Sequence, residues 1–201
     1  DPLWSRGLGD VYKRQLPVPG LHNLRNALAA IASAIAAGAP LDVAVRALAG
    51  FSPVAGRMQY KKLSDGTLLI DDTYNANPDS VRVAIDVLAR IGGTRVLVLG
   101  DMGEVGDNGP AMHVEVGNYA REQGLDALIT LGEASRAAAT AYGSGAHACA
   151  SVDEVVAALR GLRASCVLIK GSRFMRMERV VTAFTSTDGQ VSKGQGDHHA
   201  A

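Results

Sequence analysis

Hydrophobic residues first recur with helical spacing in residues 22–37. The apolar members of this face are Leu24, Leu28, Ile31 and Ile35. Three- and four-residue spacing predicts a helix, and Gly38 is a suitable stop for it. A second, shorter helix is predicted over 41–48. Residues 50–57 contain two glycines and a proline, which predicts a linker and a domain boundary.

From residue 58 onward, apolar runs alternate with segments of helical spacing. Residues 58–63 and 67–72 flank a Ser-Asp-Gly turn, which predicts a hairpin or two neighbouring strands. Ser151 and Glu154 predict a capping box at a helix start. The further strands expected are 95–100, 126–132, 147–150 and 166–171, and the helices expected are 81–88, 110–123, 133–142, 151–162 and 174–185. This order predicts an α/β fold, with a Rossmann-like, mainly parallel sheet and helices on both faces.

Both ends of the chain lack such periodicity. Residues 5–15 resemble a translated sequencing adaptor, so we expect residues 1–15 to be foreign to the fold and disordered, and the natural protein to continue upstream. Residues 187–201 are polar and rich in glycine, which predicts a disordered tail. The expected folded parts are residues 16–52 and 53–186.

Composition narrows the function classes. Hydrophobic residues make up 47% of the chain, and 20 basic residues balance 20 acidic ones, so the overall charge favours neither nucleic acid nor a membrane surface as partner. No apolar run is long enough to span a bilayer, and no signal-peptide pattern opens the chain. Cys149 and Cys166 lie in separate apolar segments, which predicts buried thiols in a reducing compartment and a cytoplasmic protein without a disulfide or a metal site.

Candidate chemistry lies where the predicted strands end, because ligands of such sheets bind beyond the carboxyl ends of the strands. In LLIDDTYNANPDS, residues 68–80, a helix start explains Asn77 as N-cap and Pro78 as first residue. It does not explain Asp72 or Asn75. A carboxylate at a strand end can bind a ribose diol, although for this stretch taken alone a purely structural turn is the favoured interpretation.

A second loop, residues 99–110, carries regularly spaced glycines and the acids Asp101, Glu104 and Asp107. Its spacing differs from G-x-G-x-x-G and its carboxylates repel phosphate, which argues against a dinucleotide site. The loop faces either a cationic or amine-bearing partner or solvent. His113, in the following helix, is positioned to bond this loop or to serve in packing.

Two further groups of polar residues suggest ligand contacts. In KGSR, Lys170 and Arg173 flank a helix start, which predicts a site for phosphate or carboxylate; a pair of surface cations is the alternative. Asn23 and Asn26 lie one helical turn apart, and their amides suit an adenine edge. Taken alone, the pair is better explained by helix capping through Asn23 and an ordinary polar helix face.

Taken in order, GLHNLRNALAA, GRM, LLIDDTYNANPDS, VLGDMGEVGD with its following histidine, and KGSR resemble the C-terminal half of a Mur ligase. The resemblance runs from residue 20 to residue 184. DDTYNANP and KGSR most resemble the branch that joins D-Ala-D-Ala to UDP-MurNAc-tripeptide in peptidoglycan precursor synthesis.

The resemblance implies a monomeric cytoplasmic enzyme of three domains that uses ATP and Mg²⁺ and proceeds through an acyl phosphate. Residues 16–52 would be helices of its central ATP-binding domain, and 53–186 its C-terminal domain. No residue of the chain is expected to be catalytic or to bind metal, because the family's Mg²⁺ ligands lie mostly in the central domain. UDP-MurNAc-tripeptide and D-Ala-D-Ala are the implied partners, with no nucleic acid or membrane.

Single residues can be assigned by the same resemblance. Asn26, with Asn23 beside it, resembles the residue that contacts adenine. Arg57 resembles the arginine that reaches the ATP phosphates, and Asp72 the aspartate that binds the ribose. The residues expected to line the acceptor side of the cleft are Asn75, Asn77, Asp101, His113, Lys170 and Arg173.

One departure from the family pattern affects activity. The 201 residues contain no G-x-x-x-x-G-K-[ST] motif, so we expect this chain alone to be unable to catalyse ligation. Another Mur-type ligase, a folylpolyglutamate synthase-like enzyme or a non-catalytic Rossmann-like binding module is the alternative.

Overall fold

A computed structural model describes residues 21–51 and 54–191 of the chain. The chain divides between Val54 and Ala55 into two compact units. Residues 1–20, which include the adaptor-like segment, and 192–201 lie outside the described residues, so the prediction of disorder at both ends stays a prediction there.

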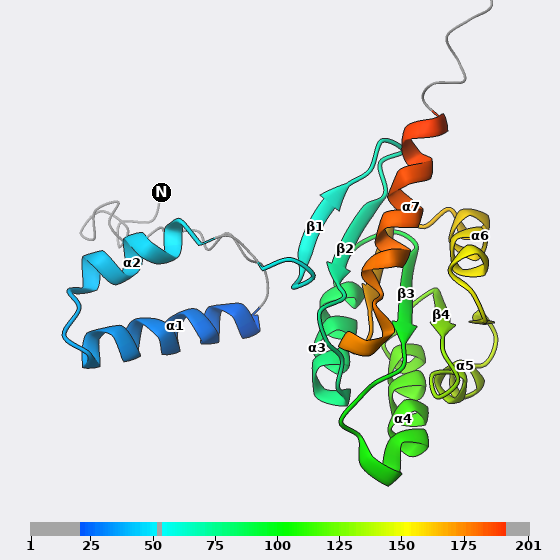
Figure 1. Cartoon of the computed structure of the whole chain (residues 1–201), viewed down its shortest axis with the longest axis horizontal. Helices are drawn as coiled ribbons and strands as arrows, with labels where there is room; N and C mark the ends of the chain where they lie inside the picture. Colours follow the sequence, from blue (N-terminus) through cyan, green and yellow to red (C-terminus); the bar gives the residue numbers. More distant parts are fainter. Residues whose placement is uncertain (1–20, 52–53, 192–201) are drawn as a thin grey trace, which may run out of the picture. The chain divides into compact units, whose positions relative to one another are not determined.

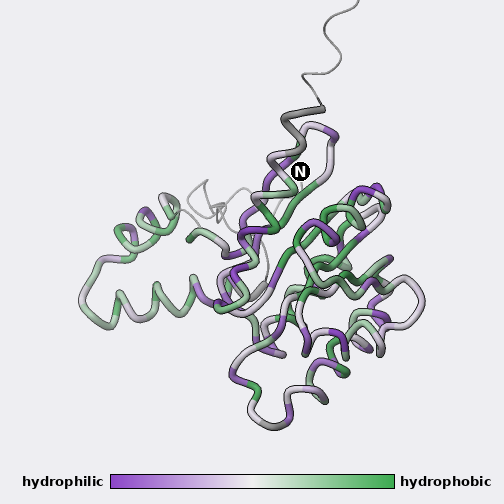
Figure 2. Tube along the Cα trace, turned by 45° about the vertical axis from the view of Figure 1, so that its right-hand side comes forward, coloured by the Kyte–Doolittle hydropathy of each residue, from purple (hydrophilic) through white to green (hydrophobic). Residues whose placement is uncertain are grey.

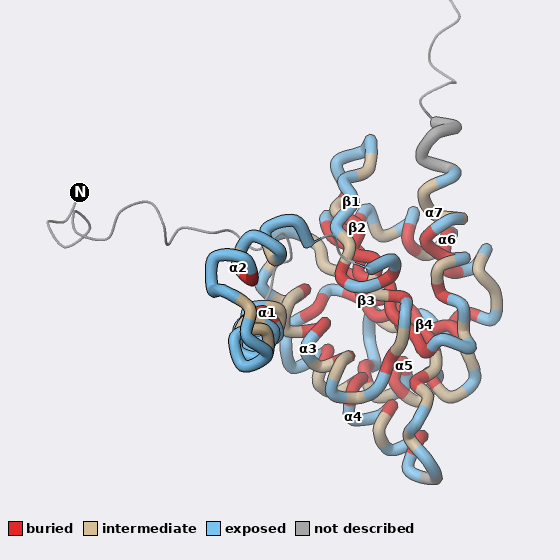
Figure 3. The backbone as a smooth tube through the Cα atoms, turned by 60° about the vertical axis from the view of Figure 1, so that its left-hand side comes forward, coloured by how far each residue is buried: buried red, intermediate tan, exposed pale blue. Residues whose placement is uncertain are grey.

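The first unit contains two helices, α1 (Leu21–Ala36) and α2 (Leu41–Ala49). Gly38, with a φ of +91°, follows α1 as predicted. Figure 2 shows these helices mostly in pale green and white, as their many alanines require, and Figure 3 shows them largely exposed. Apolar side chains that are exposed on this unit include Leu24, Leu28 and Ile35.

The second unit is built on a six-stranded sheet of order β1-β2-β6-β3-β4-β5 (Figure 1). Its strands are β1 (Gln59–Lys62), β2 (Leu68–Asp72), β3 (Arg95–Gly100), β4 (Ala127–Leu131), β5 (Ala146–Cys149) and β6 (Cys166–Lys170). Its helices are α3 (Pro78–Ala89), α4 (Gly109–Glu122), α5 (Arg136–Tyr142), α6 (Val152–Leu162) and α7 (Glu178–Val191), with 3₁₀ turns η3 (Gly106–Asn108) and η4 (Arg173–Met175). The β1–β2 pair is the predicted antiparallel hairpin, and all other pairs are parallel.

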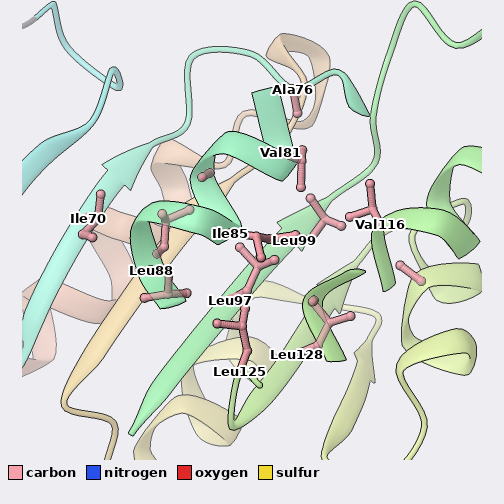
Figure 4. Packing of buried hydrophobic residues seen from close by; sticks show 14 of the residues in the cluster. Ile70, Ala76, Val81, Ile85, Leu88, Leu97, Leu99, Val116, Leu125 and Leu128 are labelled. Atoms are coloured by element: carbon pink, nitrogen blue, oxygen red, sulfur yellow. The ribbon is translucent and has the colours of Figure 1, made fainter. Parts of the chain in front are cut away.

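Two apolar layers hold helices against the sheet. In β3, Leu97 and Leu99 face the layer of α3, α4 and α5, whereas Val96 and Val98 face the layer of α6 and α7. This alternation follows from the two-residue period of a strand. Figure 4 shows the first layer, where Ile85 of α3 meets the β3 leucines. The predicted α/β sheet with helices on both faces is therefore confirmed.

Some local expectations need correction. The helix expected from residue 174 begins only at Glu178, because Arg176 has a left-handed backbone (φ +50°) that separates η4 from α7. The same helix continues to Val191, past the expected start of the tail at 187. The capping box is half right: Ser151 Oγ accepts from Glu154 N at 3.2 Å, but the Glu154 carboxylate accepts from Ala150 N.

Both cysteines are buried and free, as predicted. Burial raises the pKa of the Cys166 thiol to about 11, and burial followed by the charge of Glu154 raises that of Cys149. Both groups are therefore protonated at neutral pH and poorly nucleophilic, since the thiolate is the reactive form.

We therefore expect neither thiol to react with a disulfide reagent such as dithionitrobenzoate in the native chain at pH 7. Both should react promptly after unfolding in urea, because unfolding removes the burial that raises their pKa. The measurement is the absorbance of released thionitrobenzoate with and without urea. Rapid labelling of the native chain would contradict this description of the core.

Candidate functional site

Three strands bring the predicted polar loops together at one edge of the sheet. β6 lies between β2 and β3, so that Lys170 is opposite both Asp72 and Leu99. The chain leaves β2 and β3 toward α3 and α4 on one face, but leaves β6 toward α7 on the other. Divergence of neighbouring loops opens a crevice, the usual ligand position in open parallel sheets.

Asp72 and Lys170 form a largely buried ion pair at the centre of this edge. Lys170 Nζ donates to Asp72 Oδ2 at 2.6 Å and to the Asn75 carbonyl at 2.7 Å. Met58 N donates to Asp72 Oδ1 at 3.1 Å. The side chains of Asp72 and Lys170 are only 13% and 4% exposed. Lys170 is thus turned inward, so the alternative of two surface cations is wrong for this residue. The predicted part of Lys170 and Arg173 in an anion site stays a prediction.

Ser172 joins three loops, a role that the sequence reading missed. Its hydroxyl donates to the Ala76 carbonyl at 2.9 Å and accepts from Gly103 N. Its own N–H donates to the Asp101 carbonyl at 3.0 Å. The available signal was a small polar residue directly after a buried strand, which marks a position where side-chain oxygen can satisfy loop backbone groups.

The buried side chain of His113 links the loop after β3 to the start of α4. His113 accepts from Met102 N through Nε2 at 3.0 Å, and its Nδ1 donates to the Gly109 carbonyl at 2.7 Å. Because a carbonyl can only accept, Nδ1 is the donor in its bond to Gly109. His113 therefore bonds the loop, as one reading of the sequence proposed. It is fully buried and does not line an open surface.

Asp101 and Asn77 also have structural partners. Asp101 Oδ1 accepts from Ser135 N at 2.8 Å and so holds the turn before α5. Asn77 caps α3 by accepting from Ser80 N at 2.9 Å, and Ser80 Oγ accepts from Asn77 N in return. Pro78 is the first residue of α3, as predicted.

An exposed group of cations lies around Tyr74. The guanidinium carbons of Arg57 and Arg173 lie 4.2 and 5.9 Å from the centre of its ring. Gly56 O accepts from Tyr74 N at 2.9 Å, which holds the segment bearing Arg57 beside the loop after β2. Arg173 Nη1 lies 3.7 Å from Glu178 Oε1. Among the described residues, none forms a hydrogen bond or an ion pair with the Arg57 guanidinium, which contacts the Tyr74 ring. Arg57 therefore keeps its donors available for an anion.

Asn23 and Asn26 lie on α1 of the first unit. Asn26 is exposed and Asn23 is partly buried. Their predicted contact with adenine stays a prediction. Among the described residues, no group of three or more His, Cys, Asp or Glu could hold a metal ion, and no helix has the length and apolarity needed to cross a membrane.

Close approach of two glycines brings β3 and β6 together at the site. A Cβ on Gly171 would lie 2.5 Å from Met177 Cγ and 3.1 Å from Gly100 Cα. The fully buried Met177 leaves no space for such an atom. A glycine is therefore required at this point by packing rather than by backbone conformation.

We expect Gly171→Ala to lower the free energy of unfolding by about 1–3 kcal/mol through overpacking. Gly161→Ala is the matched control, because a Cβ there meets nothing within 4 Å. It should leave stability unchanged or raise it by up to about 1 kcal/mol through helix propensity. Urea denaturation of both variants gives the comparison, and equal effects would contradict the packing described.

Residues 56–173 match the family model described as "Mur ligase, glutamate ligase domain". The chain is 44% identical over 172 residues to UDP-N-acetylmuramoyl-tripeptide–D-alanyl-D-alanine ligase of Escherichia coli, covering 84% of this chain and 38% of that protein. It is 41% identical over 173 residues to the ligase of the same name from Haemophilus influenzae, covering 83% and 38%. The chain thus spans less than half the length of these relatives.

Solved structures agree with this assignment. MurF from Acinetobacter baumannii superposes with a TM-score of 0.78 at 35% identity, over 85% of this chain and 39% of that one. MurF from Thermotoga maritima, solved in complex with ADP, shares the fold with a TM-score of 0.76 at 24% identity, over 87% and 40%. Because the family model matches more than half of the chain, and the E. coli ligase is 44% identical over 84% of it, the chain belongs to the Mur ligase family.

Proposed function

We propose that this chain supplies the C-terminal domain of an ATP-dependent ligase that joins D-Ala-D-Ala to UDP-MurNAc-tripeptide in peptidoglycan precursor synthesis. The observation that carries the proposal is the 44% identity over 172 residues to the E. coli ligase of that name. The proposed enzyme acts as a monomer in the cytoplasm, with neither nucleic acid nor membrane as partner.

The proposed reaction forms one amide bond at the expense of ATP. The tripeptide carboxylate takes the γ-phosphoryl group of ATP and becomes an acyl phosphate, and ADP is the leaving group. The amine of D-Ala-D-Ala then attacks the acyl carbon, phosphate leaves, and the amine loses a proton. We assign the Mg²⁺ that this chemistry uses to no described residue, because none of their clusters fits a metal ion.

On the nucleotide side, Asp72 is proposed to accept hydrogen bonds from the ribose diol. Met58 N donates to Asp72 Oδ1, and Lys170 Nζ donates to Asp72 Oδ2. Each oxygen keeps a second lone pair that can accept a hydrogen bond from a ligand. The carboxylate is therefore oriented before a ligand arrives, which lowers the entropic cost of binding. Arg57, resting on Tyr74, is proposed to reach the phosphates, and Asn26 with Asn23 the adenine.

On the acceptor side, Arg173 is the exposed cation at the end of β6 and is proposed to bind the carboxylate of D-Ala-D-Ala. Asn75 is half-buried in the loop after β2 and is proposed to line the same side. The loops of this side are proposed to be held in place by contacts of Asn77, Asp101, His113 and Lys170.

A hybrid enzyme tests the proposal. Residues 21–191 of this chain replace the matching part of the E. coli ligase, and product is measured from ATP, UDP-MurNAc-tripeptide and D-Ala-D-Ala. We expect UDP-MurNAc-pentapeptide. A folded hybrid that makes no amide, or that uses only a different amino acid as acceptor, overturns the proposal. The 201-residue chain alone should make none, and product from it would contradict the expectation drawn from its missing P-loop motif.

The ribose assignment has a matched control in the neighbouring carboxylate. Asp71 bonds Lys61 and the Thr73 hydroxyl and lies next to Asp72 in β2. In the hybrid, Asp72→Asn should raise the KM for ATP about 10-fold by removing a charged acceptor. Asp71→Asn should leave that KM unchanged. The assignment fails if the two variants change the KM for ATP equally.

A further inference from the structure

Residues at the end of β6 form hydrogen bonds on the side of β2 and on the side of β3. Lys170, the last residue of the strand, reaches the side of β2, where it holds Asp72 and the Asn75 carbonyl. Ser172, two residues later, holds the next carbonyl along, that of Ala76, at 2.9 Å. Two side chains from one strand end therefore fix two consecutive carbonyls of the loop after β2.

Ser172 extends the same network to the side of β3. Its hydroxyl accepts from Gly103 N, and its N–H donates to the Asp101 carbonyl. The next residue, Glu104, has a left-handed backbone with φ of +59°, a conformation that costs free energy in a residue with a side chain. An anchor at Gly103 is what a strained loop needs to keep a single conformation.

We propose that Lys170 and Ser172 act as a brace, a pair of positioning residues that couples the nucleotide-facing carboxylate to the acceptor-side loop 101–108. This inference rests on the proposed function for the identity of the two sides. Neither side chain touches ligand in this role, because both are almost fully buried. Lys170 orients Asp72, Ser172 orients Gly103, and the 75–76 backbone connects the two.

Simple packing does not account for the choice of these residues. Removing lysine and carboxylate from water is costly, and apolar side chains of the same volume fill such a space at least as stably. What an ion pair with added hydrogen bonds provides is a fixed direction for each group. The orientation of Asp72 is thus the property that the pair secures.

The first test uses the 201-residue chain and needs no ligand. Amide hydrogen exchange is measured at Gly103 in Ser172→Ala and in Lys170→Met. The controls are Ser135→Ala, whose buried hydroxyl bonds only within its own turn to Gly132, and Lys61→Met, whose lysine pairs with Asp71. If Lys170→Met does not fold, the double variant D72N/K170M removes both charges and replaces it.

We expect exchange at Gly103 to rise about 10-fold in Ser172→Ala, the effect of one lost buried hydrogen bond. Exchange at Gly103 should also rise in the Lys170 variant, although the hydrogen bonds of Lys170 go to Asp72 and Asn75 and not to that loop. The controls Ser135→Ala and Lys61→Met should leave exchange at Gly103 unchanged. Unchanged exchange at Gly103 in the Lys170 variants would overturn the coupling, and unchanged exchange in Ser172→Ala would overturn the brace itself.

The second test uses the hybrid enzyme. Ser172→Ala should raise the KM for D-Ala-D-Ala about 10-fold, and Ser172→Thr, which keeps the hydroxyl, should restore part of the loss. Ser135→Ala should not change that KM. A loss of thermal stability in Ser172→Ala with the KM for both substrates unchanged would overturn the positioning role. An unmodified hybrid without activity would instead contradict the proposed function, and the exchange comparison would then decide the brace.

Discussion

The carboxyl edge of this sheet depends on a lysine whose charge is removed from water. Lys170 is tolerated there because Asp72 neutralises it and the Asn75 carbonyl satisfies another of its protons. Removing one partner of such a pair typically costs about 3–5 kcal/mol, since the other charge is left buried and alone. The Asp72–Lys170 contact therefore affects three features at once: the register of β6 against β2, the path of the loop after β2 and the direction of the Asp72 carboxylate.

Position in the topology gives this contact its importance. Among the described strands, the one that carries Lys170 comes last in the sequence, yet in the sheet it lies between β2 and β3. Neighbouring loops then leave toward opposite faces, and the space between them is where polar groups from distant segments can meet a ligand. Asp72, Gly103 and Ser172 are far apart in sequence and share one hydrogen-bonded neighbourhood only because of this insertion.

Local features of the sequence predicted much of this structure. The order of strands and helices, the hairpin, the cap at Asn77 and the burial of both cysteines all follow from short-range patterns. The direction of Lys170 does not, because a lysine at a strand end reads as an exposed cation until its neighbouring strand is known. Ser172 was missed for the same reason: its partners lie in two other loops. The late start of α7 reflects the left-handed Arg176, which no periodicity reveals.

The outermost strands have a further consequence, for self-association. β1 and β5 are each four residues long, and β1 carries exposed Lys61 and Lys62 on the free edge of the hairpin. An uncovered edge is a template for strand addition by another chain, and short edges with lysines are the common defence against it. The hairpin that supplies this edge begins two residues after Arg57, so the segment beside the proposed nucleotide site also leads into an edge of the kind that resists strand addition.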